Sequence, residues 1–232
     1  MTGHVIARPN RILAPLIFVI LTALSLATDA QETIDEGVLV VRRGPETLAR
    51  EEFLIQAIST GYQISSTVSY PPRRTRVVIT TVLNLNSALQ PTAFESAIRG
   101  GDRVLAQFGP RRIVFRRESA RGESAREYPA APRMLVVSDS VFALGALAGR
   151  LEQGAIRLLW PRADRQGDFD LTVEELGRVV VGGRQVEARR VVLSAESERR
   201  EYWFDSSGRL IRIRIPSDGI EIDRSWDGTT DR

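Results

Sequence analysis

The chain has 232 residues, a formal net charge of +3, no cysteine and a single histidine, His4. It also contains no lysine, so all 32 basic residues are arginines. These absences exclude disulfides, thiol and Schiff-base chemistry, and a phosphate loop with lysine; without His4, they also exclude histidine-based catalytic and metal sites. The small net charge is weak evidence for nucleic-acid binding. We therefore expect no nucleic-acid partner, cofactor or metal, and no residue is nominated as catalytic.

Residues 1–30 are typical of a secretory signal peptide. A basic start precedes a short apolar run, and Ser25, Ala27 and Ala30 allow cleavage after Ala27 or Ala30. The run is shorter than the roughly 20 residues that a membrane-spanning helix needs, and Pro15 interrupts it. We therefore expect a periplasmic or secreted protein without a membrane span after cleavage. A retained N-terminal anchor is the alternative.

Residues 31–232 are expected to form a single β-rich domain. Short runs of Val, Ile, Leu, Thr and aromatic residues alternate with Gly, Pro, Asp and Ser, which is typical of antiparallel strands joined by tight turns. Residues 37–56 predict a hairpin around Gly44-Pro45. Residues 178–193 predict another around Gly182-Gly183, because glycine adopts the positive φ of a two-residue hairpin turn. In all, we expect roughly a dozen short strands.

An arginine-rich segment lies in the middle of the chain. Residues 117–132 mix Arg, Glu, Ser and Gly without periodicity, so we expect a flexible, exposed loop there. Arginines in and just before it are candidates for binding an anionic headgroup or a polysaccharide: Arg111, Arg112, Arg116 and Arg117. The interleaved glutamates favour a solvated surface instead.

Residues 138–151, SDSVFALGALAGRL, differ from the rest of the chain. Capping residues and apolar side chains at helical spacing predict an apolar helix, weakened by Gly145 and Gly149. Such a helix packs in the concavity of a curved sheet. The predicted fold is therefore mainly β: one strongly curved antiparallel sheet, a half-barrel or open barrel, packed on a single apolar helix.

Residues 201–216, EYWFDSSGRLIRIRIP, alternate apolar and charged side chains around a polar turn. The alternation places Tyr202 and Phe204 on the same face as Ile211 and Ile213. The register with the next strand then matches isoleucines with isoleucines and arginines with acids: Ile215 with Ile220, Ile213 with Ile222, Arg214 with Glu221, and Arg212 with Asp223. We interpret this stretch as architecture, because a one-residue slip would turn its arginines into the core.

These motifs carry a resemblance. The aromatic strand, the DSSG turn and RLIRIRIP, together with GVLVVRRGPETLAREEF and VGGRQVEARRVVL, resemble uncharacterised exported bacterial β-proteins of the domain-of-unknown-function kind. The resemblance implies one antiparallel sheet curved around a helix, similar in architecture to lipoprotein-localisation carriers. It supplies no catalytic residues.

Carboxylates are the remaining acid-base candidates. DFDLTVEEL contains Asp168 and Asp170, which share one face of a strand about 7 Å apart. Simple alternation produces this spacing, and the motif lacks the third oxygen ligand and the turn glycine of a calcium loop. A carboxylate-dependent hydrolase is therefore a minor alternative.

The leading hypothesis is a non-catalytic binder of an apolar or lipid-like ligand held in the sheet concavity. Its ligand-binding candidates are Phe142, Leu144, Leu147, Tyr202, Phe204, Ile211 and Ile213. The alternative is a structural or protein-interaction module with a filled core that docks another envelope protein. Trp160, Trp203 and Trp226 either line a cavity or anchor the core.

Overall fold

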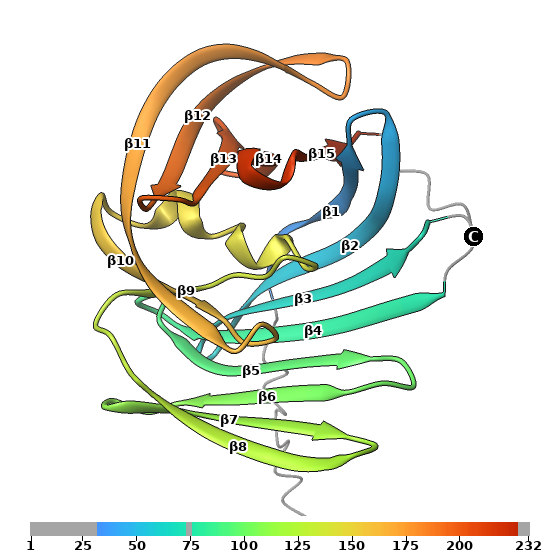
Figure 1. Cartoon of the computed structure of the whole chain (residues 1–232). Coiled ribbons are helices and arrows are strands. Elements are labelled where there is room, and N and C mark those ends of the chain that lie inside the picture. The colour runs from blue at the N-terminus through green and yellow to red at the C-terminus, as the bar shows by residue number, and fades with distance from the viewer. Residues whose placement is uncertain (1–31, 73–75, 227–232) are drawn as a thin grey trace, which may run out of the picture.

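The computed structural model describes residues 32–72 and 76–226, and the expected signal peptide lies outside the described residues. The described residues form a single sheet of 15 strands and three short 3-10 helices (Figure 1). The predicted mainly β fold, with one strongly curved open sheet, is confirmed. Among the residues described, no helix is long and apolar enough to cross a membrane.

The elements follow one another along the chain with short connections. The strands are β1 (Glu32–Arg43), β2 (Glu46–Ile58), β3 (Gly61–Tyr70), β4 (Val77–Asn86), β5 (Pro91–Ile98), β6 (Arg103–Phe108), β7 (Arg112–Ser119), β8 (Gly122–Pro129), β9 (Met134–Val136), β10 (Gly154–Trp160), β11 (Arg165–Val181), β12 (Arg184–Ser194), β13 (Arg199–Asp205), β14 (Leu210–Ile215) and β15 (Ile220–Ser225). The 3-10 helices are η1 (Ala143–Gly145), η2 (Ala148–Arg150) and η3 (Pro216–Asp218).

The sheet consists of two meanders joined by the first and last strands. Its order is β8-β7-β6-β5-β4-β3-β2-β1-β15-β14-β13-β12-β11-β10-β9, and every neighbouring pair is antiparallel except β9 and β10. The antiparallel β1–β15 pair, which runs from Val38 opposite Ser225 to Arg43 opposite Ile220, connects the two halves. The two edges, β8 and β9, are consecutive in the chain. The sheet curls into an open barrel in which β9 contacts β5 without pairing with it, and β6, β7 and β8 continue beyond this contact.

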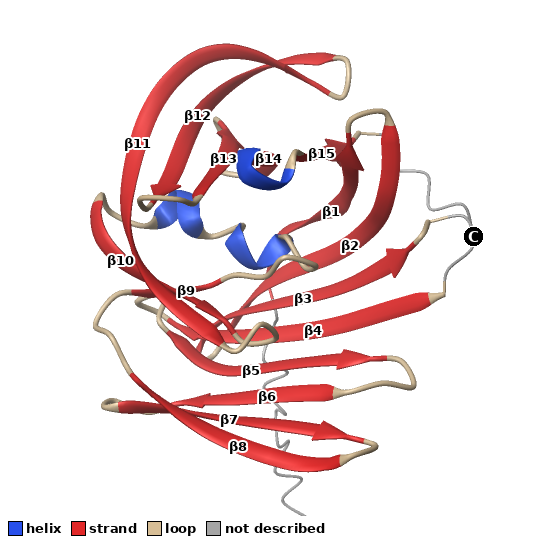
Figure 2. Ribbon diagram, viewed as in Figure 1, coloured by secondary structure: helices blue, strands red, loops and turns tan. Residues whose placement is uncertain are grey.

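Residues 138–151, here called the plug, lie inside the curve of the sheet (Figure 2). The predicted position is correct, but the segment forms the two separate turns η1 and η2 instead of one continuous helix. A methyl group on Gly149 would lie 2.9 Å from Cγ of Phe204, and one on Gly145 would clash with Tyr202. The chain therefore passes too close to β13 for larger residues at these two positions, and glycine weakens a regular α-helix there.

The plug crosses the barrel from one rim to the other. It begins beside the end of β3, where the Tyr70 hydroxyl donates to the Ser140 carbonyl over 2.7 Å. It ends beside the start of β3, where the Arg150 guanidinium lies 5.6 Å from the centre of the Tyr62 ring. Because all side chains from Val141 to Gly149 are buried, this segment forms the centre of the core.

The prediction of a flexible loop near residues 117–132 is wrong, because β7 and β8 form a regular hairpin through most of this range. Phe115 and Tyr128 pack edge to face across it, with ring centres 5.2 Å apart. Ion pairs between its arginines and glutamates replace the missing apolar alternation on the outer face. The segment is exposed as expected, but cross-strand contacts give it a fixed structure.

The predicted C-terminal register is confirmed in all four pairs, from Arg212 opposite Asp223 to Ile215 opposite Ile220. One residue pattern differs. A β-bulge between β13 and β14 pairs Phe204 with Leu210, so Leu210 joins the interior core and Ile211 turns to the outer face. A bulge adds one residue to one strand and reverses the alternation beyond it.

Candidate functional site

The predicted ligand-binding residues themselves fill the concavity in which we expected a ligand. Six of the seven nominated residues are at most 4% exposed and belong to one continuous apolar core: Phe142, Leu144, Leu147, Tyr202, Phe204 and Ile213. The plug side chains pack against the sheet side chains, and the two glycines of the plug lie against Tyr202 and Phe204. These residues therefore contact one another, and their apolar surfaces are covered by protein.

Ile211 does not belong to this group. It packs with Val181, Ala188 and Trp203 in a second, smaller cluster on the outer face of the sheet. The Arg190 and Arg214 guanidiniums lie 5.7 and 5.5 Å from the Trp203 ring centre. The inclusion of Ile211 among interior residues was wrong because a strand alternation read across a turn does not reveal a bulge.

The three tryptophans also divide between the two faces. Trp160 is 1% exposed and belongs to the interior core. Trp226 packs against the outer cluster, where its indole N–H donates to the Val181 carbonyl over 2.9 Å. All three anchor packed clusters, and none lines an open interior.

Glu51 on β2 is the polar attachment point of the plug. Its Oε1 accepts hydrogen bonds from Ser66 Oγ at 2.6 Å and from the Ala143 N–H at 3.0 Å. Its Oε2 accepts the Phe142 N–H at 2.8 Å. One carboxylate thus satisfies two backbone donors at the start of η1 that have no helical partner of their own.

The environment of Glu51 changes its acidity. Burial raises the pKa of Glu51, and the hydrogen bonds from Ser66, Ala143 and Phe142 offset this only in part. Burial and the nearby Glu51 charge raise the pKa of Tyr70, whose hydroxyl also holds the plug. Glu51 was not among the predicted site residues, because an acid within a charged strand gives no local sign that it faces inward.

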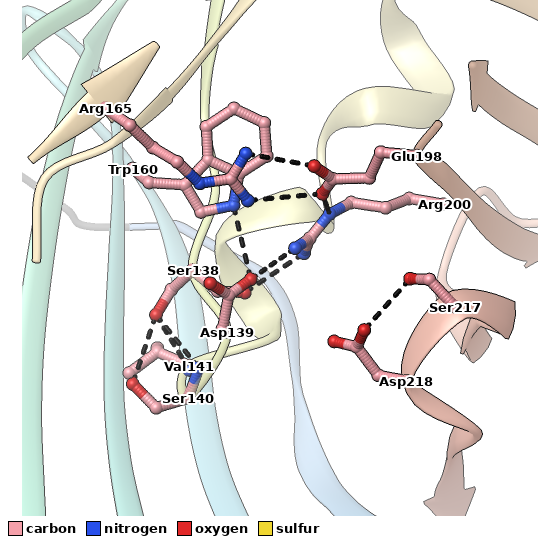
Figure 3. Close-up of polar contacts among 10 residues, drawn as sticks. All are labelled: Ser138, Asp139, Ser140, Val141, Trp160, Arg165, Glu198, Arg200, Ser217 and Asp218. Carbon is pink, nitrogen blue, oxygen red and sulfur yellow. Dashed lines mark hydrogen bonds and ion pairs between the residues drawn. The ribbon is translucent and has the colours of Figure 1, made fainter. Parts of the chain in front are cut away.

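A second polar cluster closes the rim at the start of the plug (Figure 3). Arg200 is 2% exposed and donates to the Ser138 carbonyl at 3.1 Å and to Glu198 at 3.0 Å. It also forms an ion pair with Asp139, whose carboxylate accepts the Trp160 indole N–H at 3.2 Å. Two acids therefore neutralise the buried guanidinium, and the Ser138 carbonyl accepts one of its N–H groups, as a buried charge requires.

Arg165 completes this cluster on the solvent side. Its guanidinium lies 3.6 Å from the Trp160 ring centre and donates to Glu198 at 2.9 Å. Burial alone would raise the pKa of Glu198, but hydrogen bonds from Arg165 and Arg200 outweigh it and lower the pKa. A general acid at neutral pH needs a raised pKa, so the cluster is built for ion pairing.

The structure does not bring the anion-binding candidates together. Arg112 and Arg116 lie on the outer face of β7, paired with Glu127 at 3.2 Å and Glu123 at 4.0 Å. Arg111 is exposed just before the strand. These arginines therefore lie along a surface ladder, where neighbouring carboxylates compete with any added anion.

Arg117 has a different position, on the inward side of the β7–β8 hairpin. It lies 3.8 Å from Asp102 and donates to the Arg162 carbonyl, while Arg162 itself pairs with Asp102 at 2.6 Å. Nearby, the Tyr128 hydroxyl donates to the Asp164 carbonyl at 2.9 Å. These contacts tie the β10–β11 turn to the β5–β8 region, so side chains close the barrel where strand pairing stops.

Two acidic residues of β11, Asp168 and Glu174, form surface ion pairs. Asp168 accepts two hydrogen bonds from Arg157, at 2.7 and 3.0 Å, and the bond from Arg157 lowers the pKa of Asp168. Glu174 forms an ion pair with Arg190. Over the described residues, no group of three or more acidic or histidine side chains is arranged to hold a metal ion. These observations show no catalytic or metal-binding arrangement among the described acidic residues of β11.

Open space lies beside residues 130–133, which link the edge strands β8 and β9. This region is here called the seam. One hollow has a volume of about 410 Å³, and a neighbouring one has about 470 Å³. They meet at three shared residues: Gln90, Pro132 and Met134. The residues 130–133 that link β8 to β9 pass between them, and the Gln90 amide ties this link to the β4–β5 turn by donating to the Pro132 carbonyl at 3.0 Å.

The comparisons with known proteins concern the fold. Among solved structures, the chain is similar to the crystal structure of a β-barrel-like protein of domain of unknown function DUF1849 from Brucella abortus. The two are 11% identical, the match covers 84% of this chain and 94% of that chain, and the TM-score is 0.48. Comparison with protein-family models and with curated proteins gives no match.

Proposed function

We propose that this chain is a non-catalytic binding protein of the cell envelope whose apolar or lipid-like ligand occupies the seam, and not the concavity. The observation that carries the proposal is the arrangement of the hollows: the plug fills the interior, and the two seam hollows of about 410 and 470 Å³ share three lining residues. Two further hollows of about 480 and 470 Å³, near Pro71 and Trp226, share one, Arg50. Small-molecule sites have volumes of roughly 300–1,000 Å³ and are found at the mouths of β-barrels.

The test measures whether the protein carries or takes up a lipid-like ligand. The same measurement is made on a variant in which a large side chain blocks the seam. Protein purified without detergent is extracted with organic solvent for mass spectrometry and then titrated with a fluorescent fatty acid. Ala88→Trp places a large ring at the first hollow, whereas Ala120→Trp places the same ring at the exposed β7–β8 turn. We expect binding to be lost in the first variant and kept in the second. Absence of both a copurified lipid and probe uptake by the unmodified protein would reject the proposal.

Export is a separate part of the proposal, supported by the pattern of residues 1–30. N-terminal sequencing of the protein recovered from the cell envelope checks it. A mature chain that begins after Ala27 or Ala30 is the expected result, and recovery of an uncleaved chain from the cytoplasm would contradict it.

The second candidate function is a protein-interaction module. It is favoured by the filled core and by β8, an exposed edge strand of eight residues. An edge strand can accept a strand from a partner. A photo-crosslinking residue at Ala125 tests this candidate: crosslinks at Ala125 but not at Ala120 would support it, and equal or absent crosslinks would not.

A further inference from the structure

The first seam hollow has an apolar floor. Met134 and Ile156 are buried there, and Leu89 and Leu151 are half-buried beside them. Leu89 has φ of 59°, a left-handed backbone conformation that L-residues other than asparagine and aspartate seldom adopt. The β4–β5 turn thus holds a leucine side chain at a position where glycine would be easier to accommodate.

Two arginines stand at the rim of this hollow. Arg133 donates to the carbonyls of Glu152 and Gln153, the latter over 3.3 Å. Gly154 leaves room for it, since a methyl group there would lie 3.1 Å from Arg133 Nη1. A guanidinium has five N–H donors, and these backbone contacts leave several of them available. Arg133 is therefore positioned by the backbone while its charge is not neutralised by these carbonyls.

Arg150 comes from the end of η2 and lines the same hollow. Its guanidinium lies over the Tyr62 ring, 5.6 Å from the ring centre. Within residues 32–72 and 76–226, neither Arg133 nor Arg150 has a carboxylate within 4.0 Å, unlike Arg157 or Arg200. Glu152 is the one acid among the residues that line this hollow, so the lining has a net positive charge.

We infer that this hollow binds an anionic amphiphile, a fatty-acid-type carboxylate, with the headgroup between Arg133 and Arg150 and the alkyl chain on the apolar floor. This inference rests on the proposed function and names the ligand class. Guanidinium groups favour carboxylates because two parallel N–H groups match the two oxygens.

The second hollow extends the path for the alkyl chain. Its lining contains no charged side chain and includes the apolar residues Phe108, Pro110, Ala131 and Met134. Because the two hollows adjoin each other at Gln90, Pro132 and Met134, an alkyl chain that starts at the arginines would extend past these three residues into the second hollow. The charged end and the uncharged end of the seam therefore match the two ends of the ligand.

The experiment compares probes that differ only in headgroup. Dodecanoate, dodecyltrimethylammonium and dodecyl maltoside are titrated calorimetrically, below their micelle concentrations and at a pH where dodecanoate is ionised; acetate tests the headgroup alone. We expect dodecanoate to bind tightest and acetate to bind weakly. The double variant Arg133→Gln/Arg150→Gln should weaken dodecanoate binding by about tenfold or more and leave dodecyl maltoside unchanged.

A matched variant removes the same charge elsewhere. Arg43→Gln/Arg99→Gln alters two exposed arginines at turns on the far rim, and dodecanoate binding should stay unchanged. If the double seam variant does not fold, Arg150→Gln alone serves, because its described contact is with the Tyr62 ring.

The outcomes distinguish ligand binding at the seam from the preference for an anionic headgroup. Equal affinity for all three amphiphiles, or dodecanoate binding that survives loss of the seam arginines, overturns the inference and leaves seam binding intact. Binding that the Ala88→Trp variant does not affect places the ligand elsewhere and overturns both. No binding of any amphiphile also rejects both.

Discussion

At Glu51, a side chain with no solvent exposure accepts two backbone N–H groups of the plug and the hydroxyl of Ser66. Two strands away across the sheet, Arg224, 7% exposed, is a comparable residue, whose guanidinium pairs with Asp35 at 2.8 Å. In each case a buried charge satisfies groups that the backbone leaves unpaired. Individual polar residues therefore connect parts of the core that apolar packing alone would not orient.

Glu51→Gln should lower the stability of the fold by about 1–3 kcal/mol, because the amide nitrogen cannot accept the backbone N–H that one carboxylate oxygen accepts. The substitution should also change the pH dependence of stability. The pKa of Glu51 is raised above the ordinary value of 4.5, so between pH 4.5 and its raised pKa the folded protein keeps a proton that the unfolded chain loses. Its contribution is complete below pH 4.5 and decreases as pH rises through that window. Urea unfolding across this range should show the slope in the parent and not in the variant.

Glu198→Gln is the comparison with opposite sign. The pKa of Glu198 is lowered below 4.5, so its contribution is present above pH 4.5 and is lost as pH falls through the lowered value. The variant should therefore lose part of its acid-side pH dependence and keep the slope above pH 4.5. A Glu51 variant that retains the full slope above pH 4.5 would contradict the assignment of that slope to Glu51.

At the scale of elements, the plug and the β13–β14 hairpin determine each other's conformation. The two 3-10 turns follow the surface of β13, and the bulge in the hairpin determines which side chains face the plug. An isolated helix would bury one stripe, whereas this segment buries its whole circumference from Val141 to Gly149. The plug is thus structured by the sheet around it.

Gly149→Ala should destabilise the protein by about 1–3 kcal/mol, because the added methyl group would lie 2.9 Å from the Phe204 ring in a filled core. Gly145→Ala should lower the stability at least as much, because its methyl group would clash with the Tyr202 ring. Gly167→Ala is the control, since its methyl group would meet the Phe169 ring edge at 3.3 Å. Thermal melting of the three variants ranks them. A stabilising effect of alanine at both plug positions would instead indicate a continuous helix in solution.

Ile213→Arg should cost about 4 kcal/mol or more, because it places a charge in the core beside Tyr202 and Ile222. Arg214→Ile changes the neighbouring residue on the outer face, where Arg214 pairs with Glu221 at 2.8 Å. Loss of that exposed pair should cost less than about 1 kcal/mol. Similar chemical denaturation midpoints for the two variants would show that the faces are wrongly assigned.

At the scale of the whole molecule, the barrel is held together at two different places. The first and last strands pair in the centre of the sheet, and side-chain contacts such as Arg162 with Asp102 close the opposite side. The seam exists because β8 and β9 are neighbours in the chain but not in the sheet. Closure by side chains leaves the space at the seam that continuous strand pairing would have filled.

Arg224→Met should destabilise the junction of the two halves by about 3–5 kcal/mol, because it leaves Asp35 buried without its partner. The double variant Asp35→Leu/Arg224→Met should recover most of this loss, since it removes both charges. A double-mutant cycle of unfolding free energies measures the coupling. A coupling near zero would show that the pair does not join the halves.

Much of the local structure could be predicted from the sequence. Alternation correctly placed Ile213 and Ile215 of β14 and Ile220 and Ile222 of β15 in the core, and it paired the charges of these strands correctly; it failed only at Ile211, beyond the bulge. The Gly182-Gly183 turn was equally evident, with φ of 55° and 77°. The strand β8 was missed because it lacks apolar alternation, although Arg and Glu pair across the β7–β8 hairpin.

The β class, the local registers and the exclusion of cysteine and lysine chemistry follow from the amino-acid sequence alone, because these depend on composition and on side chains two residues apart. The folded chain was needed to show that the concavity is filled, that Leu210 replaces Ile211 inside, and that Arg133 and Arg150 line one hollow. Occupied volume, burial and charge pairing arise between residues far apart in the chain. No local pattern contains them, and the packed sheet establishes them.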